Sequence, residues 1–430
     1  MNYLGVILLL TLTSLLSAGS ENRVRAHSVH KAIQKILETE KKEFSVMEEF
    51  HSAIASGKVI GQARSMYSLY KSLEGIESHV IAIGGMLRYE IAEYYGLNFA
   101  SVIVMTKDIE LFSKNIQYYN NELSGDEHRY IELSEVYINY NYDGLSFCIG
   151  RQIIDTPLAD SDDVRMIANS FEAYTAFYNT DSFSFMLGHF DRWQGTDADL
   201  NEGWIKTGED GVTYTGALFT NKLLDIAVWY YDFSNPSKKD LQEGSLAVAN
   251  RSFYSDISAH VNFNKDVFLH FNAQYLLQKG YDDSLIEANI YGLMGEVVYK
   301  KFGMRLAYNK AQKKANKESF VGYGGGTLYT SMDAATLDVI TKDRSAYATV
   351  GILSYHLNRF KFLYAYGIFK GDSDSNGLKA KIEEHNFGVK YMYNNFITLG
   401  AIYVTDRNKD EPQSLEFNND NFRLMFAYNF

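Results

Sequence analysis

The chain ends in Phe422-Arg423-Leu424-Met425-Phe426-Ala427-Tyr428-Asn429-Phe430, where every even position carries a large apolar or aromatic side chain. In an extended strand these five groups share one face, while Arg423 and Asn429 lie on the other. Such a strand, ending on an aromatic carboxylate, is typical of the closing strand of bacterial outer-membrane β-barrels. Phe430 is then predicted to carry the signal read by the barrel assembly machinery. The edge strand of a soluble β-protein is the alternative interpretation.

The N-terminus has the pattern of an export signal. Tyr3 to Leu16 is almost continuously apolar, and the small residues Ser17-Ala18-Gly19-Ser20 follow. This run has the length of a signal-peptide core and is too short to span a bilayer as a helix. It departs from the usual pattern in having no Lys or Arg before it. We predict a signal peptide over residues 1–20, cleaved near Ser20, and export to the outer membrane.

Composition narrows the class of protein. The chain has 33 Tyr and 27 Phe, as expected where aromatic girdles meet two membrane interfaces. Its three prolines (Pro157, Pro236 and Pro412) fall in polar, loop-like stretches, which suits a protein built of paired strands. The single Cys148 excludes an intramolecular disulfide and is expected to be a small buried residue. A net charge of −12 argues against nucleic acid as a partner.

Alternation of apolar and polar residues recurs from residue 58 to the end. Ile257, Ala259, Val261 and Phe263, for example, alternate with polar neighbours, and the apolar faces carry almost no charge. This favours lipid outside the apolar face over the interior of a soluble sandwich. Eight short turns are predicted at 95–96, 142–144, 179–181, 220–222, 264–266, 300–302, 357–359 and 393–395. They imply an all-β fold, a transmembrane antiparallel β-barrel of about 18 strands over residues 58–430.

A different periodicity precedes the barrel. Apolar residues spaced by three or four predict an amphipathic helix over 27–56, bent near 40–43. They are Val29, Ile33, Ile36, Phe44, Met47, Phe50 and Ile54. We therefore expect residues 21–57 to form a helical segment in the periplasm or in the barrel mouth. A contact with other subunits or with the cell wall is the alternative.

Two stretches resemble a known family. Residues 50–64, from Phe50-His51-Ser52 to Gln62-Ala63-Arg64, are similar to the start of the first strand in OprD-type outer-membrane porins, in the form found in Campylobacterota. Residues 150–158, 163–167 and 170–172 resemble the inward-folding third loop of that family and its flanks. The helical prefix and the weak N-terminal charge depart from the family pattern.

The resemblance implies an eighteen-stranded barrel through which small hydrophilic solutes and ions diffuse passively, often with arginines along the lumen. Porins in general are commonly homotrimers, so a homotrimer is the expected assembly. Members of the family differ widely in substrate, so the solute and the charge selectivity do not follow from it. An outer-membrane barrel with a plugged lumen, acting as an adhesin or enzyme through its surface loops, is the alternative. An exported soluble β-protein is the third interpretation.

Selectivity in a narrow aqueous path arises from charges on its wall and on inward loops. The acidic segment 153–169, between two predicted strands, is the expected loop. The predicted constriction residues are Arg151, Asp155, Asp163 and Arg165. The predicted lumen-wall residues are Arg64, Arg88 and Glu90. Alternatively, these charges pair with one another and only brace the loop.

Other motifs carry less weight. Residues 372–383 fit the EF-hand spacing of acidic ligands, but predicted strands flank them where an EF-hand has helices, so an acidic surface loop is the competing interpretation. The glycine run 322–326 lacks the Lys-Ser/Thr of a phosphate loop and is expected to be a loop or wall passage that needs small residues. No catalytic motif is present, so we predict no enzyme activity, no cofactor and no metal site.

Overall fold

The computed structural model describes residues 46–73, 75–109, 122–198, 200–242, 246–410 and 417–430. The predicted signal peptide and most of the predicted helix 27–56 lie outside these residues. The helix is described from Val46 to Ala55 as α2, which ends one residue before the predicted boundary. Among the described residues, no helix is long and apolar enough to cross a membrane.

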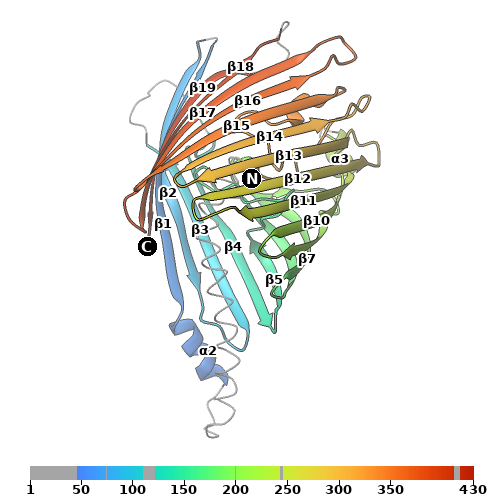
Figure 1. Ribbon diagram of the computed structural model, residues 1–430. Helices are drawn as coiled ribbons and strands as arrows, with labels where there is room; N and C mark the ends of the chain where they lie inside the picture. The colour runs from blue at the N-terminus through green and yellow to red at the C-terminus, as the bar shows by residue number, and fades with distance from the viewer. Residues whose placement is uncertain (1–45, 74, 110–121, 199, 243–245, 411–416) are drawn as a thin grey trace.

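Within the described residues, eighteen antiparallel strands form one closed wall (Figure 1). They are β1 (Lys58–Ser72), β2 (Glu77–Glu90), β3 (Leu97–Asp108), β4 (Arg129–Tyr142), β5 (Leu145–Gln152), β6 (Ser170–Asn179), β7 (Phe183–Gln194), β9 (Val212–Thr220), β10 (Leu224–Phe233), β11 (Asn250–Asn262), β12 (Val267–Gly280), β13 (Glu287–Tyr299), β14 (Phe302–Ala311), β15 (Ala346–Leu357), β16 (Phe360–Gly371), β17 (Ala380–Met392), β18 (Ile397–Asn408) and β19 (Asn418–Asn429). The two-residue strand β8 (Ile205–Lys206) pairs only with β7. Short helices α3 (Lys238–Gln242), η2 (Thr196–Ala198) and η3 (Asp338–Ile340) lie in the connections.

The last strand closes the barrel against the first. β19 pairs with β1 in a register that places Arg64 opposite Ala427 and Ser68 opposite Arg423. Phe430 exchanges backbone hydrogen bonds of 2.8 and 2.9 Å with Gly61. The predicted all-β barrel of about 18 strands is therefore confirmed, and each of the eight predicted short turns joins two neighbouring strands at the same end of the wall.

The two faces of the wall differ in the way that a membrane requires. Large apolar side chains at alternate positions are exposed on the outside, for example Ile149 at 56% and Leu293 at 62%. Buried polar groups such as Gln274, Arg305 and Asn309 point inward. Because this is the reverse of a soluble protein's pattern, the outer face is suited to contact lipid.

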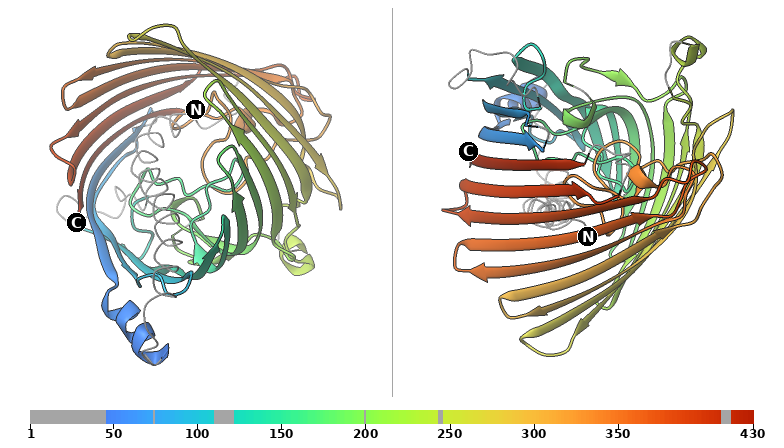
Figure 2. Two further views of the ribbon diagram at one scale, coloured as in Figure 1. Left: turned by 60° about the horizontal axis from the view of Figure 1, so that its bottom comes forward. Right: turned by 90° about the horizontal axis from the view of Figure 1, so that it is seen from above.

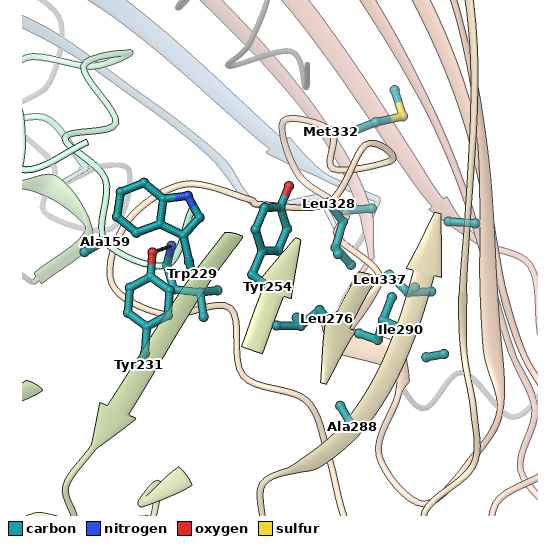
Figure 3. Packing of buried hydrophobic residues seen from close by; sticks show 14 of the residues in the cluster. Ala159, Trp229, Tyr231, Tyr254, Leu276, Ala288, Ile290, Leu328, Met332 and Leu337 are labelled. Carbon is teal, nitrogen blue, oxygen red and sulfur yellow. Dashed lines mark hydrogen bonds between the residues drawn. The ribbon is translucent and has the colours of Figure 1, made fainter. Parts of the chain in front are cut away.

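In addition to the apolar outer surface, the barrel has a hydrophobic core in its interior, between the wall and the inward loops. Inward aromatic residues of β6 to β10 pack in a row, with Tyr231 stacked 5.6 Å from Phe233 and 6.2 Å from Trp229. Loop residues 153–169 and 312–345 cover this row and the wall beyond it, as Figure 3 shows for Ala159 beside Tyr231. Figure 2 shows these loops crossing the interior. The loops therefore narrow the lumen from one side.

Candidate pore constriction

The loop after β5 folds inward because it is apolar at its base. Ile154, Leu158 and Ala159 are buried against the inward aromatic residues of the wall. The backbone amide of Leu158 donates a hydrogen bond of 3.4 Å to the Tyr231 hydroxyl oxygen. Burial of these side chains gives the loop segment 153–169 a fixed place inside the barrel, as the sequence predicted for an inward loop.

A second loop, 312–345, pairs with the first across the interior. The amide of Tyr323 donates to the Leu158 carbonyl at 3.0 Å, and the amide of Asp160 donates to the Tyr323 carbonyl at 2.9 Å. Gly322 and Gly324 have positive φ, and a Cβ on either would lie 2.1 or 2.3 Å from a carbonyl oxygen of the first loop. The two backbones therefore approach too closely at Gly322 and Gly324 for a larger residue, which explains why these two positions are glycine.

The same loop is also attached to the opposite wall. The amides of Ala334 and Ala335 donate to the Glu384 carboxylate of β17 at 3.1 and 2.6 Å. Asp333, beside them, accepts two hydrogen bonds from the guanidinium of Arg423 on β19. Loop 312–345 thus spans the lumen from the first loop to the closing strand.

Charged side chains from four loops and two strands meet next to this crossing. Arg64 on β1 donates to both carboxylate oxygens of Asp163 at 2.7 and 3.1 Å, and to the backbone carbonyl of Arg165. Arg165 in turn forms ion pairs with Glu122 at 2.9 Å and Asp197 at 3.5 Å. We call Arg64, Glu122, Asp163, Arg165, Asp197, Asp333 and Arg423 the constriction cluster.

Glu122 connects the cluster to the closing seam of the barrel. It follows the loop after β3 and accepts a hydrogen bond of 3.1 Å from Ser68, whose strand partner is Arg423. Burial alone would raise the pKa of Glu122, but the nearby guanidiniums of Arg165 and Arg423 outweigh it and hold that pKa below its usual value. Glu122 is therefore an ionised carboxylate at neutral pH.

Two other acids of the first loop behave in the opposite way. Burial and the neighbouring Asp155 raise the pKa of Asp160 to about 7. Burial and the neighbouring Asp197 raise the pKa of Asp162 to about 8. These carboxyl groups change charge near neutral pH, so the net charge beside the constriction depends on pH.

The predicted site residues fall into separate groups. The structure brings Arg64, Asp163 and Arg165 together, as described above. Asp155 accepts a hydrogen bond from the amide of Ser161 at 3.1 Å, which braces its own loop. Arg88 on β2 pairs with Glu90 at 3.2 Å and with Glu135 of β4 at 3.3 Å, in an inward ladder away from the constriction cluster.

Arg151 lies apart from the other predicted constriction residues. It is two and four positions from Ile149 and Phe147 on β5, both exposed and apolar, so strand alternation places it on the outward face. Its guanidinium pairs with Glu172 at 3.0 Å and lies 4.4 Å over the ring of Trp204. The structure thus separates Arg151 from the constriction cluster, and a role for it in the constriction stays a prediction.

Sequence reasoning missed several members of the constriction cluster. Glu122, Asp197 and Asp333 lie in loops whose inward fold no periodicity predicts. Arg423 could have been found, because it is the charged residue on the polar face of the closing strand. Its burial to 5% exposure marks it as a lumen residue held by partners.

The remaining motifs find structural explanations. In loop 372–379, the Asp374 carboxylate accepts hydrogen bonds from the amides of Asn376 and Leu378 at 2.9 Å and pairs with Arg344 at 2.9 Å. Its oxygens are thus committed to a turn and an ion pair. No group of three or more candidate ligands suited to a metal ion occurs in the part of the chain that the structure describes. Cys148 is buried, as expected.

The fold is that of outer-membrane β-barrel proteins with known structures. No family profile matches the chain, and no curated protein sequence matches it either. Several solved structures do match. Among them are Pseudomonas aeruginosa OpdK with vanillate (TM-score 0.70, 15% identity, 88% of this chain and 99% of that chain), Acinetobacter baumannii OccAB2 (0.72, 13%, 88% and 99%) and P. aeruginosa OccD3, also called OpdP (0.69, 13%, 88% and 92%). At these identities the likeness establishes a shared fold.

Proposed function

We propose that this chain is an OprD-type outer-membrane porin through which small hydrophilic solutes and ions diffuse passively. The observation that carries the proposal is the constriction cluster, to which four loops and the two strands of the closing seam contribute inside a closed barrel. Charged groups that line a confined aqueous path set the local field there, and this field screens solutes by charge. The likeness to Occ-type structures supports the same function.

The charges of the cluster favour a weak preference for cations. It contains three guanidiniums and the four carboxylates of Glu122, Asp163, Asp197 and Asp333, counted over the described residues. Asp160 and Asp162, with pKa values raised to about 7 and about 8, add negative charge only as the pH rises through those values. Cation preference is therefore expected to increase from pH 6 to pH 9.

The proposal also covers how the chain reaches the outer membrane and assembles there. Residues 1–20 direct export, and Phe430 directs insertion by the barrel assembly machinery. The backbone bonds between Phe430 and Gly61 support this role, since the terminal residue itself closes the wall. The proposed assembly is a homotrimer, and chemical cross-linking in native outer membranes tests it. Deletion of Phe430 tests the signal: the amount of folded barrel in the outer membrane is expected to fall.

Single-channel recording of the refolded protein in a planar bilayer with a KCl gradient tests the function. Stepwise, ohmic openings are expected, with a reversal potential whose sign indicates cation preference. Protein that inserts but never conducts would contradict a porin and would indicate a plugged barrel. Insertion is scored independently by the change in electrophoretic mobility that folded barrels show after heating.

A further inference from the structure

Helix α2 (Val46–Ala55) lies at the short-turn end of the barrel, below β1 and β2 (Figure 1). Specific contacts attach it there. The amide of Ala92 donates to the Ala53 carbonyl at 3.0 Å, and the hydroxyl of Tyr89 donates to the Ile54 carbonyl at 2.6 Å. The helix therefore has a defined position on the rim of the wall.

That position is on the outer side of the rim. Tyr89 shares a strand face with Ile83 and Leu87, both exposed apolar residues of the outward surface. Its strand partner on β1 is Val59, another exposed apolar residue. Figure 2 (left) shows α2 projecting beyond the ends of the first strands. The helix consequently continues the lipid-facing surface and does not enter the barrel mouth.

The level of α2 along the barrel coincides with a girdle of aromatic side chains. Exposed aromatic residues at the short turns and strand ends of this rim are Tyr95, Tyr142, Phe263, Tyr299, Tyr393, Phe396 and Phe430. The Tyr95 hydroxyl donates to Glu49 of α2 at 2.8 Å, and the ring of Phe50 lies 5.8 Å from that of Tyr94. Aromatic girdles in such barrels mark the membrane–water interface.

The helix has two unlike flanks beside its line of attachment. Ala53 is buried against the barrel. Phe50 and Ile54, four residues apart and so on one flank, are each 40% exposed. Ser52, also exposed, lies about half a turn away on the other flank. An apolar flank at the interface and a polar flank beside it are the features of a helix lying in a membrane surface.

We propose that α2 is an interfacial helix that inserts Phe50 and Ile54 into the periplasmic leaflet of the outer membrane, at the boundary between headgroups and acyl chains. The occupant of the apolar flank is lipid, because that flank is continuous with the lipid-facing surface through Tyr89 and Val59. Two side chains suffice, since the contacts to Tyr89, Ala92 and Tyr95 already hold the helix at the interface. The inference depends on the outer-membrane location but not on solute passage.

Site-specific quenching tests the proposal with the full chain in phosphatidylethanolamine–phosphatidylglycerol vesicles. In a Cys148→Ser background, an environment-sensitive dye is attached to Ile54→Cys, to the matched control Ser52→Cys, or to Leu293→Cys on the outward wall. Lipids with a nitroxide near the headgroup are expected to quench the dye at position 54 about threefold more than at position 52. If Ile54→Cys does not fold, Phe50→Cys on the same flank replaces it.

Three results would overturn the proposal. Equal, weak lipid quenching at 54 and 52, with equal quenching by iodide in solution, would place the flank in water. Shielding of position 54 from both quenchers would show a protein surface covering it. A lack of lipid quenching at Leu293→Cys would show that the barrel itself is not in the bilayer, whereas quenching at 293 without conductance would contradict only the porin function.

Discussion

Arg423 on the closing strand β19 forms an ion pair with Asp333 in loop 312–345, in which one guanidinium nitrogen donates to both carboxylate oxygens. This pair joins the long inward loop to the seam where the barrel closes, and Arg423 is buried to 5% exposure beneath it. Strand β19 therefore has two structural roles: it closes the wall against β1, and it holds the loop that narrows the lumen.

Asp333→Asn is expected to loosen that loop. The substitution removes the charge that faces Arg423, and a hydrogen bond to a charged group contributes about 1.5–3 kcal/mol. We expect a lower free energy of unfolding by about that amount and a larger, noisier single-channel conductance. Asp372→Asn, on an exposed position of loop 372–379, is the control and should change neither quantity. Unchanged noise in Asp333→Asn would contradict the role of the pair.

Arg64→Gln is expected to shift selectivity toward cations. It removes a guanidinium that faces Asp163 at 2.7 Å and leaves that carboxylate exposed to passing ions. The cation-to-anion permeability ratio, from reversal potentials in a KCl gradient, should rise about twofold to threefold. Arg151→Gln removes the same charge from the outward face and should leave the ratio unchanged. Equal shifts in both variants would place Arg151 in the lumen after all.

The acids of the first loop are expected to make the protein sensitive to pH. A carboxyl group whose pKa is raised on folding stabilises the protein less as the pH rises, from the unfolded value near 4 up to the folded value. For Asp162, with a pKa of about 8, the loss extends from about pH 4 to about pH 8. In Asp162→Asn, the free energy of unfolding and the reversal potential should therefore both depend less on pH across that range.

The measurement is thermal unfolding and channel recording at intervals from pH 5 to pH 9. Asp162 has a positive φ of 38°, which asparagine also adopts readily, so the substitution preserves the backbone. If Asp162→Asn keeps the full pH dependence, groups other than Asp162 are responsible for that dependence.

Gly324→Ala is expected to separate the two inward loops. The added Cβ would lie 2.3 Å from the Asp160 carbonyl oxygen, at a φ of +110° that costs alanine about 1–3 kcal/mol by itself. Faster proteolysis within 312–345 and a lower unfolding temperature are expected. Gly351→Ala on β15, where a Cβ meets nothing within 4 Å, is the matched control. Equal protease resistance in the two variants would argue against the pairing.

The strands were predictable because their information is local. Alternation with a period of two identifies each strand and its two faces, and the eight short turns mark where the chain reverses. For Arg151, alternation and proximity to the loop point to different faces, since Ile149, two residues before it, is an exposed residue of the outward face. The part of helix 27–56 that is described also ends where its periodicity ends.

The constriction cluster could only be predicted in part. Arg64 and Asp163 are 99 residues apart, and Arg423 and Asp333 are 90 residues apart. Their meeting depends on how far each loop enters the barrel, which the aromatic core of β6 to β10 and the glycines at 322 and 324 decide.

By itself, the sequence predicted a membrane barrel of about 18 strands with Phe430 at the end of its closing strand, because each strand's alternation and each turn depend on neighbouring residues. Only the tertiary structure decided which charges face one another in the lumen and that α2 lies outside the rim. Those outcomes depend on contacts between segments that are distant in the sequence. Packing across the whole wall decides how far each loop enters the barrel, and no local periodicity in the sequence reports it.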